Sequence, residues 1–295
     1  RQAGGCIGTV VAPLLIAWLS RYLPWQDVFM VAGAIGLVIA VFWCFIYKNP
    51  PAEVLALTVE TESADSDEKK SAPAFSWGAL WGTKSLWGCL LVRLISDPVW
   101  YFCCFWLPGF LRDMGQAQGL SHQETLDMIQ YVGGIPFFIG AIGGVLAGFW
   151  SDSMVKRGMP SLKARKVMMV SLVVFAPLCM LTPLVSNAAG LSFDVRLYLI
   201  IGIFSLTAVM CLSWLYTIMV VIAESFPLKN VASVSGICCG AGAIGGTLFN
   251  LIVGYLMSTM GGMVFIIMGC LHIIASVCLI KLVHPETPKP SQIAK

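Results

Sequence analysis

Long apolar runs recur along this chain, and they restrict its fold more than any other feature. Of the 295 residues, 58% are hydrophobic and only 11% are charged, whereas soluble domains carry about 25% charged residues. A helix that crosses a membrane needs about 20 mostly apolar residues. Hydropathy over such a window predicts eight spans, at 3–19, 28–47, 86–111, 128–149, 167–185, 197–223, 231–257 and 262–283. The sequence thus predicts an all-α integral membrane protein and excludes a disordered chain, a nucleic-acid-binding module and nearly every soluble enzyme.

One polar stretch divides the predicted spans into two groups. Residues 50–76 carry eight charged residues among serines and prolines, a composition typical of a solvated linker. We therefore expect two helices in residues 1–49, a cytoplasmic linker at 50–78, six helices in 79–284 and a cytoplasmic tail at 285–295.

The distribution of basic residues predicts the orientation of the chain. Fourteen Lys and Arg lie on one side of the spans, and three lie on the other, Arg21, Arg112 and Arg196. Short cytoplasmic loops carry an excess of Lys and Arg. We expect a multi-pass protein of the inner (plasma) membrane, in contact with the lipid bilayer, with both termini of this chain in the cytoplasm.

Two charged residues lie within the third predicted span. Arg93 and Asp97 are four residues apart, so they share one helix face and can form an ion pair. Counted from Leu86, Asp97 lies roughly 16 Å deep, near the middle of a hydrocarbon core about 30 Å thick. Such charges mark functional sites by default, although a pair that only neutralises itself would fit the same pattern. Pro98 follows directly and predicts a kink. His272, in the last span, is expected to be a hydrogen-bonded core residue.

Glycines and cysteines in the apolar runs are interpreted as packing residues. Gly240, Gly242 and Gly245 spell G-x-G-x-x-G, but they follow no strand, and the first acidic residue after them is Glu286, so a dinucleotide site is rejected. Small residues at such spacings allow membrane helices to approach closely. The eleven cysteines contain no C-x-x-C pair, which argues against a metal site. We predict no cofactor and no metal.

The loop after the fourth span places opposite charges near helix ends. Gly148 and Asp152 precede a basic run that includes Arg157, and Glu224 ends the sixth span. These residues would form a latch at the cytoplasmic side, or the loop is an ordinary basic cytoplasmic loop. The sequence leaves both interpretations open.

Several motifs resemble one membrane transporter family. The segment from Gly148 to Gly158 resembles a cytoplasmic signature of the major facilitator superfamily, and residues 93–108 resemble the seventh helix of its anion:cation symporter branch, in particular of hexuronate transporters. Residues 25–50 and 242–256 resemble the sixth-helix and eleventh-helix regions of the same branch. The resemblance implies a partial major facilitator fold, in which the eight spans correspond to helices five to twelve and helices one to four are absent.

The resemblance also implies a function, the import of a hexuronate with protons by alternating access in a monomer. Arg93 would bind the substrate carboxylate or hold Asp97 ionised until substrate arrives, and Asp97 would bind hydroxyl groups or exchange protons. Asn250 would bind sugar hydroxyl groups or bridge two helices. The other implied substrate contacts are Trp100, Tyr101, Trp106, Ser213 and Trp214. The alternatives are another organic anion (galactonate, glucarate or an aromatic acid) or a non-transporting sensor. A membrane enzyme would require a cluster such as H-E-x-x-H, which the three scattered histidines do not form.

Overall fold

The described residues fold into helices joined by short turns. The computed structural model describes residues 22–48, 75–260 and 262–287, together with residues 8, 15, 16 and 18–20. Its elements are α2 (Trp25–Ile46), α5 (Trp77–Trp81), α6 (Lys84–Ala117), α7 (His122–Val132), α8 (Ile135–Lys156), α9 (Ser161–Leu172), the 3₁₀ helix η1 (Val173–Leu181), α10 (Thr182–Ser186), α11 (Phe193–Ser225), α12 (Leu228–Met260) and α13 (Met263–Leu282).

Seven helical segments of the described residues are long and apolar enough to cross a membrane. They coincide with the second to eighth predicted spans, which confirms the all-α, multi-pass architecture. The first predicted span, 3–19, and the linker at 50–78 lie almost wholly outside the described residues, as does most of the tail at 285–295.

Helix α6 continues through Pro98 and Pro108 as one helix of 34 residues, as the span at 86–111 predicted, and the kink expected at Pro98 stays a prediction. Two other segments depart from uniform spans. The fourth span is divided into α7 and α8 at Gly133 and Gly134. The fifth span changes from α9 to a 3₁₀ helix that contains Pro177, because proline lacks the N–H that an α-helical bond requires.

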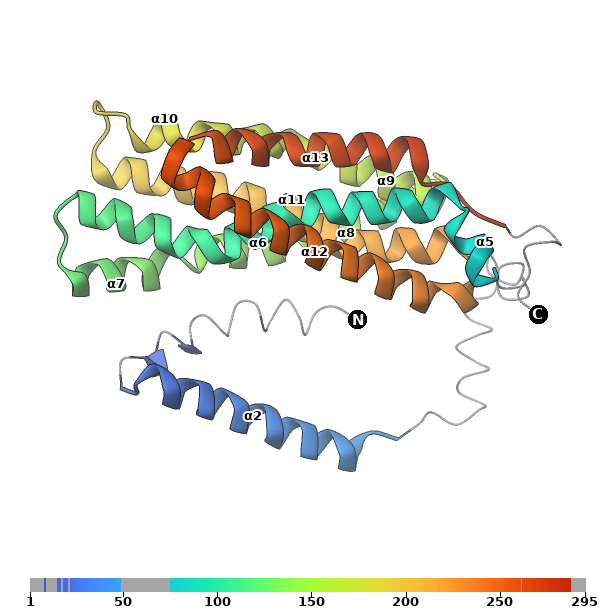
Figure 1. Ribbon diagram of the computed structural model, residues 1–295, viewed down its shortest axis with the longest axis horizontal. Helices are drawn as coiled ribbons and strands as arrows, with labels where there is room; N and C mark the ends of the chain where they lie inside the picture. The colour runs from blue at the N-terminus through green and yellow to red at the C-terminus, as the bar shows by residue number, and fades with distance from the viewer. Residues whose placement is uncertain are drawn as a thin grey trace.

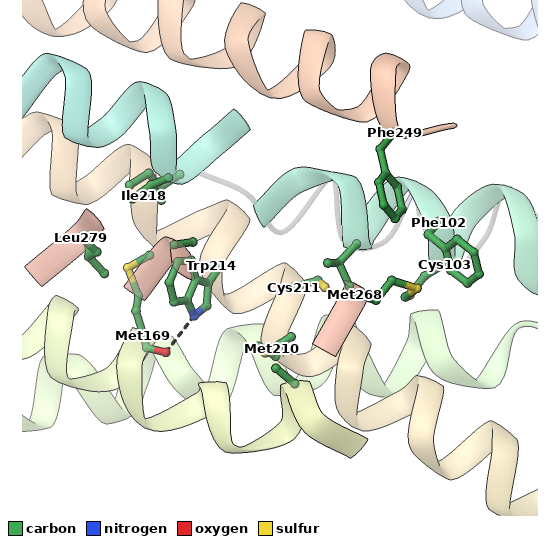
Figure 2. Packing of buried hydrophobic residues seen from close by; sticks show 14 of the residues in the cluster. Phe102, Cys103, Met169, Met210, Cys211, Trp214, Ile218, Phe249, Met268 and Leu279 are labelled. Atoms are coloured by element: carbon green, nitrogen blue, oxygen red, sulfur yellow. Dashed lines mark hydrogen bonds between the residues drawn. The ribbon is translucent and has the colours of Figure 1, made fainter. Parts of the chain in front are cut away.

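Helix α6 lies at the centre of the bundle, in contact with α11, α12 and α13, while α8 packs along α11 (Figure 1). The core between them contains large side chains that are almost completely buried, among them Phe102 of α6 and Met210 of α11 (Figure 2). Helix α2 contrasts with this bundle, since Val28 is its buried residue and its large apolar side chains are exposed.

Glycines allow α8 to approach α11 closely. A Cβ atom added at Gly140 would lie 2.8 Å from the Cβ of Ala208, and one at Gly143 would lie 2.5 Å from a methyl carbon of Val209. Gly148 meets nothing within 4 Å. The sequence predicts packing glycines at Gly140, Gly144 and Gly148; this prediction is confirmed at Gly140 and wrong at Gly148.

Two sets of hydrogen bonds connect the helices at the end of the bundle where α6 begins. The Glu286 carboxylate accepts hydrogen bonds from the Ser85 hydroxyl (2.7 Å) and the Ser85 backbone N–H (3.3 Å), while the Glu286 N–H donates to the Ser225 carbonyl at 2.7 Å. The Asn230 amide bonds both the N–H and the C=O of Phe75. These contacts join the first turn of α6 to the end of α11, and the chain before α5 to α12.

Candidate functional site

Arg93 and Asp97 form an ion pair inside the bundle. The Arg93 Nη2 atom lies 3.0 Å from Asp97 Oδ2, and each side chain is 7% exposed. The two residues occupy successive turns of α6, as their spacing predicted. Breaking such a buried pair by removing one partner costs about 3–5 kcal/mol, because an uncompensated charge remains.

The pair leaves part of the guanidinium group without a partner. Arg93 Nε and Nη1 are buried and have no hydrogen-bond partner among the described residues. A buried polar group without a partner costs about 1–3 kcal/mol, and more when it is charged. The arrangement therefore retains capacity to bind an anion or a hydroxyl oxygen at Arg93.

Glycines of α12 lie against the part of α6 that carries the Arg93–Asp97 ion pair. A Cβ atom at Gly242 would collide with the Asp97 carboxylate, one at Gly245 with the Leu94 carbonyl, and one at Gly246 with the Tyr101 ring. Three glycines predicted to be packing residues thus form a surface against which α6 lies. Gly240, the first glycine of the same pattern, meets nothing within 4 Å.

An open groove of about 840 Å³ continues along the same two helices. On α6 its wall is the stripe Tyr101, Phe105, Gly109 and Arg112, spaced by one helical turn, with Trp106 beside it. Asn250 lies on the α12 wall and accepts a hydrogen bond from Trp106 Nε1 at 3.0 Å. The groove therefore combines aromatic faces, an amide and one guanidinium group.

The ion pair is next to the groove but not part of its wall. Tyr101, which lines the groove, lies one helical turn from Asp97, about 6 Å along the axis. Its ring stacks on Phe105, with ring centroids 6.0 Å apart, and packs on Gly246. Tyr101 thus separates the groove from Arg93 and Asp97 in this conformation.

The remaining aromatic and hydroxyl candidates pack within the bundle. Trp100 meets Phe137 of α8 edge to face at 5.7 Å. The indole of Trp214 is 2% exposed and donates to the Met169 carbonyl at 2.8 Å (Figure 2), and the buried Ser213 hydroxyl donates to the Val209 carbonyl at 2.6 Å. The structure places Trp100 and Trp214 at helix–helix contacts and bonds Ser213 to its own helix, and none of the three lines the groove.

His272 is buried, as its sequence context predicted, but the hydrogen bonds expected of it are missing. Neither ring nitrogen has a hydrogen-bond partner among the described residues, and the side chain meets the Trp214 ring edge to face at 5.0 Å. The prediction of a hydrogen-bonded imidazole is therefore wrong, because α13 turns His272 toward an aromatic ring.

Comparison with protein families identifies the chain. A family model described as the Major Facilitator Superfamily matches residues 1–217 and 125–295. The chain belongs to the major facilitator superfamily. Members of this superfamily are transporters, so the prediction that the chain is not an enzyme is confirmed, and the described helices form a partial major facilitator fold.

Several curated proteins that are similar to this chain are named as sugar-acid transporters. A "Probable galactarate/D-glucarate transporter" of Escherichia coli (strain K12) is 27% identical over 91% of this chain and 60% of the relative. A "Hexuronate transporter" of the same organism is 23% identical over 88% and 58%. A "Probable L-galactonate transporter" is 29% identical over 58% and 37%. The chain spans at most about three fifths of the length of these relatives.

In this member of the superfamily, Arg165 of α9 connects the last turns of α8 to the end of α11. Asp152 Oδ1 lies 2.5 Å from Arg165 Nη1, and Glu224 Oε1 lies 3.7 Å from Arg165 Nε. The Ser161 hydroxyl also donates to Glu224 Oε1 at 2.5 Å. Arg157, expected in this latch, instead ends α8 and is exposed.

Sequence reasoning did not select Arg165, which links the two carboxylates. It counted Arg165 only as one more basic residue of the loop, although Arg165 lies one helical turn beyond Ser161 in α9. The sequence did contain a sign of this contact, because Asp152 and Arg165 stand near the two ends of one short loop, and Glu224 also stands at a helix end.

Replacing Arg165 by glutamine is expected to lower the unfolding free energy by about 1–3 kcal/mol. The side chain is 15% exposed, and its removal breaks its ion pairs with Asp152 and with Glu224, which is 18% exposed. Thermal unfolding of the detergent-purified protein measures the change. The matched control is Arg157→Gln at the exposed end of α8, which should change stability by less than about 0.5 kcal/mol.

Proposed function

We propose that this protein is a secondary transporter that imports a sugar acid together with protons by alternating access. The groove between α6 and α12 is the observation that carries this proposal. Its aromatic faces suit the apolar side of a sugar ring, and its amide suits hydroxyl groups. The similarity to sugar-acid transporters supports the same substrate class.

The Arg93–Asp97 pair is proposed to link substrate and proton binding. Asp97 neutralises Arg93 in the present conformation, while two guanidinium nitrogens, Nε and Nη1, have no hydrogen-bond partner within the described parts of the chain. Protonation of Asp97 would release Arg93 to bind a substrate carboxylate. Moving a negative charge inward against a potential of 100 mV costs about 2.3 kcal/mol, and proton co-transport removes that cost.

The proposed cycle needs two bundles that rock around the groove. Residues 79–284 are proposed to form one bundle, and α2 to belong to the other, with the linker at 50–78 between them. Gly148, Asp152, Arg165 and Glu224 would close the cytoplasmic side, and both ends of the chain would face the cytoplasm. A monomer in the inner membrane suffices for this cycle.

A competition experiment in proteoliposomes tests the proposal. Uptake of labelled galacturonate, driven by an imposed pH gradient, would be measured with unlabelled glucuronate, galactonate, galactarate, glucarate and benzoate as competitors. We propose a hexuronate as the substrate and expect the hexuronates to compete best. Stronger competition by galactarate or galactonate would move the assignment to another sugar acid, and binding without uptake would favour a sensor.

The Trp106–Asn250 hydrogen bond gives a further prediction. Replacing Asn250 by leucine removes the amide from the groove, and we expect the KM for uptake to rise about 5- to 15-fold, because one or two hydrogen bonds to substrate are worth about 1–1.5 kcal/mol. The control is Thr247→Val on the same wall. Both polar groups donate to a backbone carbonyl one turn back, Asn250 Nδ2 to Gly246 at 2.8 Å and Thr247 Oγ1 to Ala243 at 2.9 Å, but only Asn250 also bonds Trp106. Equal KM values for both variants would remove Asn250 from the binding site.

A further inference from the structure

Arg112 is the cationic residue in the wall of the groove. Arg93 lies outside that wall, and among the described residues that line the groove none carries a carboxylate. The Arg112 side chain is 57% exposed, and its Nη2 atom lies 3.2 Å from Asp113 Oδ1. Asp113 is itself 69% exposed, so solvent weakens this pair, and Arg112 remains accessible to an anion.

The length of α6 places Arg112 at one mouth of the groove. The helix of 34 residues is about 51 Å long, whereas the hydrocarbon core is about 30 Å thick. Counted from Leu86, Arg112 lies roughly 39 Å along the helix, about 9 Å beyond the core. The predicted orientation places this end outside the cytoplasm, where substrate enters.

Arg112 and Arg93 are too far apart to bind one substrate molecule. Nineteen residues of helix separate them, about 28 Å. A six-carbon acid, with five C–C bonds of about 1.5 Å each, spans less than 8 Å. Arg112 therefore cannot hold the second carboxylate of an acid whose first carboxylate is bound at Arg93, and the two arginines must act one after the other.

We propose that Arg112 is an entry site, which captures the carboxylate of an incoming sugar acid at the outer mouth of the groove before the acid reaches Trp106, Asn250 and the buried pair. An exposed cation at the mouth of a cleft raises the local concentration of an anion and its rate of association. Asp113 opposes this attraction. The inference rests on the proposed function and adds to it a first binding step.

The test compares the uptake kinetics of Arg112→Gln, Arg112→Lys and Asp113→Asn in right-side-out proteoliposomes, with galacturonate and galactarate as probes. At an ionic strength of 0.01 M, Arg112→Gln should raise KM about threefold, and at 1 M by less than about 1.5-fold, because salt screens the attraction. Arg112→Lys should stay within about 1.5-fold of the unsubstituted protein. Asp113→Asn should lower KM about twofold. Maximal velocity should not change in any variant.

Comparing uptake with exit distinguishes the capture of substrate at Arg112 from a structural effect of the substitution. Exit of substrate from preloaded vesicles starts at the opposite mouth, so its half-saturation should be the same in Arg112→Gln and in the unsubstituted protein. A KM that is unaltered at low salt, or a fall in maximal velocity at both salt concentrations, would overturn the entry site. Failure of the unsubstituted protein to take up either acid would contradict the proposed function itself, and the entry site with it.

Discussion

Asp97→Asn is expected to abolish accumulation of a sugar acid against its gradient. Asparagine cannot exchange a proton, so a pH gradient would no longer drive uptake, and the internal concentration should stop at the external one. Exchange of labelled for unlabelled substrate needs no net proton transfer and should remain measurable. Accumulation in proteoliposomes, with exchange measured in parallel, checks this expectation. Unchanged accumulation would remove Asp97 from the coupling mechanism.

A double substitution separates the coupling role of the pair from its role in stability. Arg93→Met alone leaves the Asp97 carboxylate buried without its partner and should lower the unfolding free energy by about 3–5 kcal/mol. Adding Asp97→Leu removes the second charge and should restore most of that loss. If the pair serves transport, the restored double variant remains unable to accumulate substrate. Full accumulation by the double variant would show that the pair is only structural.

Gly242→Ala is expected to have the second large effect. Its Cβ atom would overlap the Asp97 carboxylate, which lies beside the Arg93 side chain. Either α12 moves away from α6 or the ion pair rearranges. Overpacking of this kind costs about 1–3 kcal/mol, and we expect uptake to fall at least tenfold. Thermal unfolding and initial uptake rates measure the two effects.

The same helix offers a control for the glycine substitution. Gly236 and Gly240 of α12 meet nothing within 4 Å, so alanine at either position should leave uptake unchanged and add slightly to helix stability. A loss of uptake in Gly240→Ala equal to that in Gly242→Ala would indicate a general effect of α12 flexibility and not the contact with Asp97.

The spans and the ion pair could be predicted from the sequence because both depend on local spacing. An apolar run of fixed length determines a membrane helix, and residues four apart meet on one helix whatever surrounds them. The positions of Asp97 and Arg93 follow directly from this rule. The predicted span at 86–111 runs through Pro98 and Pro108, and α6 is one helix over these residues. Its packing against three neighbouring helices could not be predicted from local spacing.

The environment of the candidate residues depends on partners from other helices and could not be predicted from spacing. Trp214 and Trp106 are both tryptophans in apolar runs, yet one donates to the backbone of α9 in the core and the other to Asn250 in the groove. The prediction that both contact substrate therefore treated two different environments alike. Arg165 was missed for the same reason, since its two carboxylate partners come from separate helices.

The matched positions of α6 and α12 restrict how this bundle can change shape. Asp97 lies at Gly242 and Tyr101 at Gly246, so the same offset of 145 residues relates both contacts. If α6 slid along α12 by half a turn, Asp97 or Tyr101 would collide with a residue that has a side chain. If it slid by a whole turn, one of these two residues would no longer face a glycine. Helices α6 and α12 are therefore held in one register and form one wall of the groove. A change in access to the groove must then come from other elements that move relative to this pair of helices.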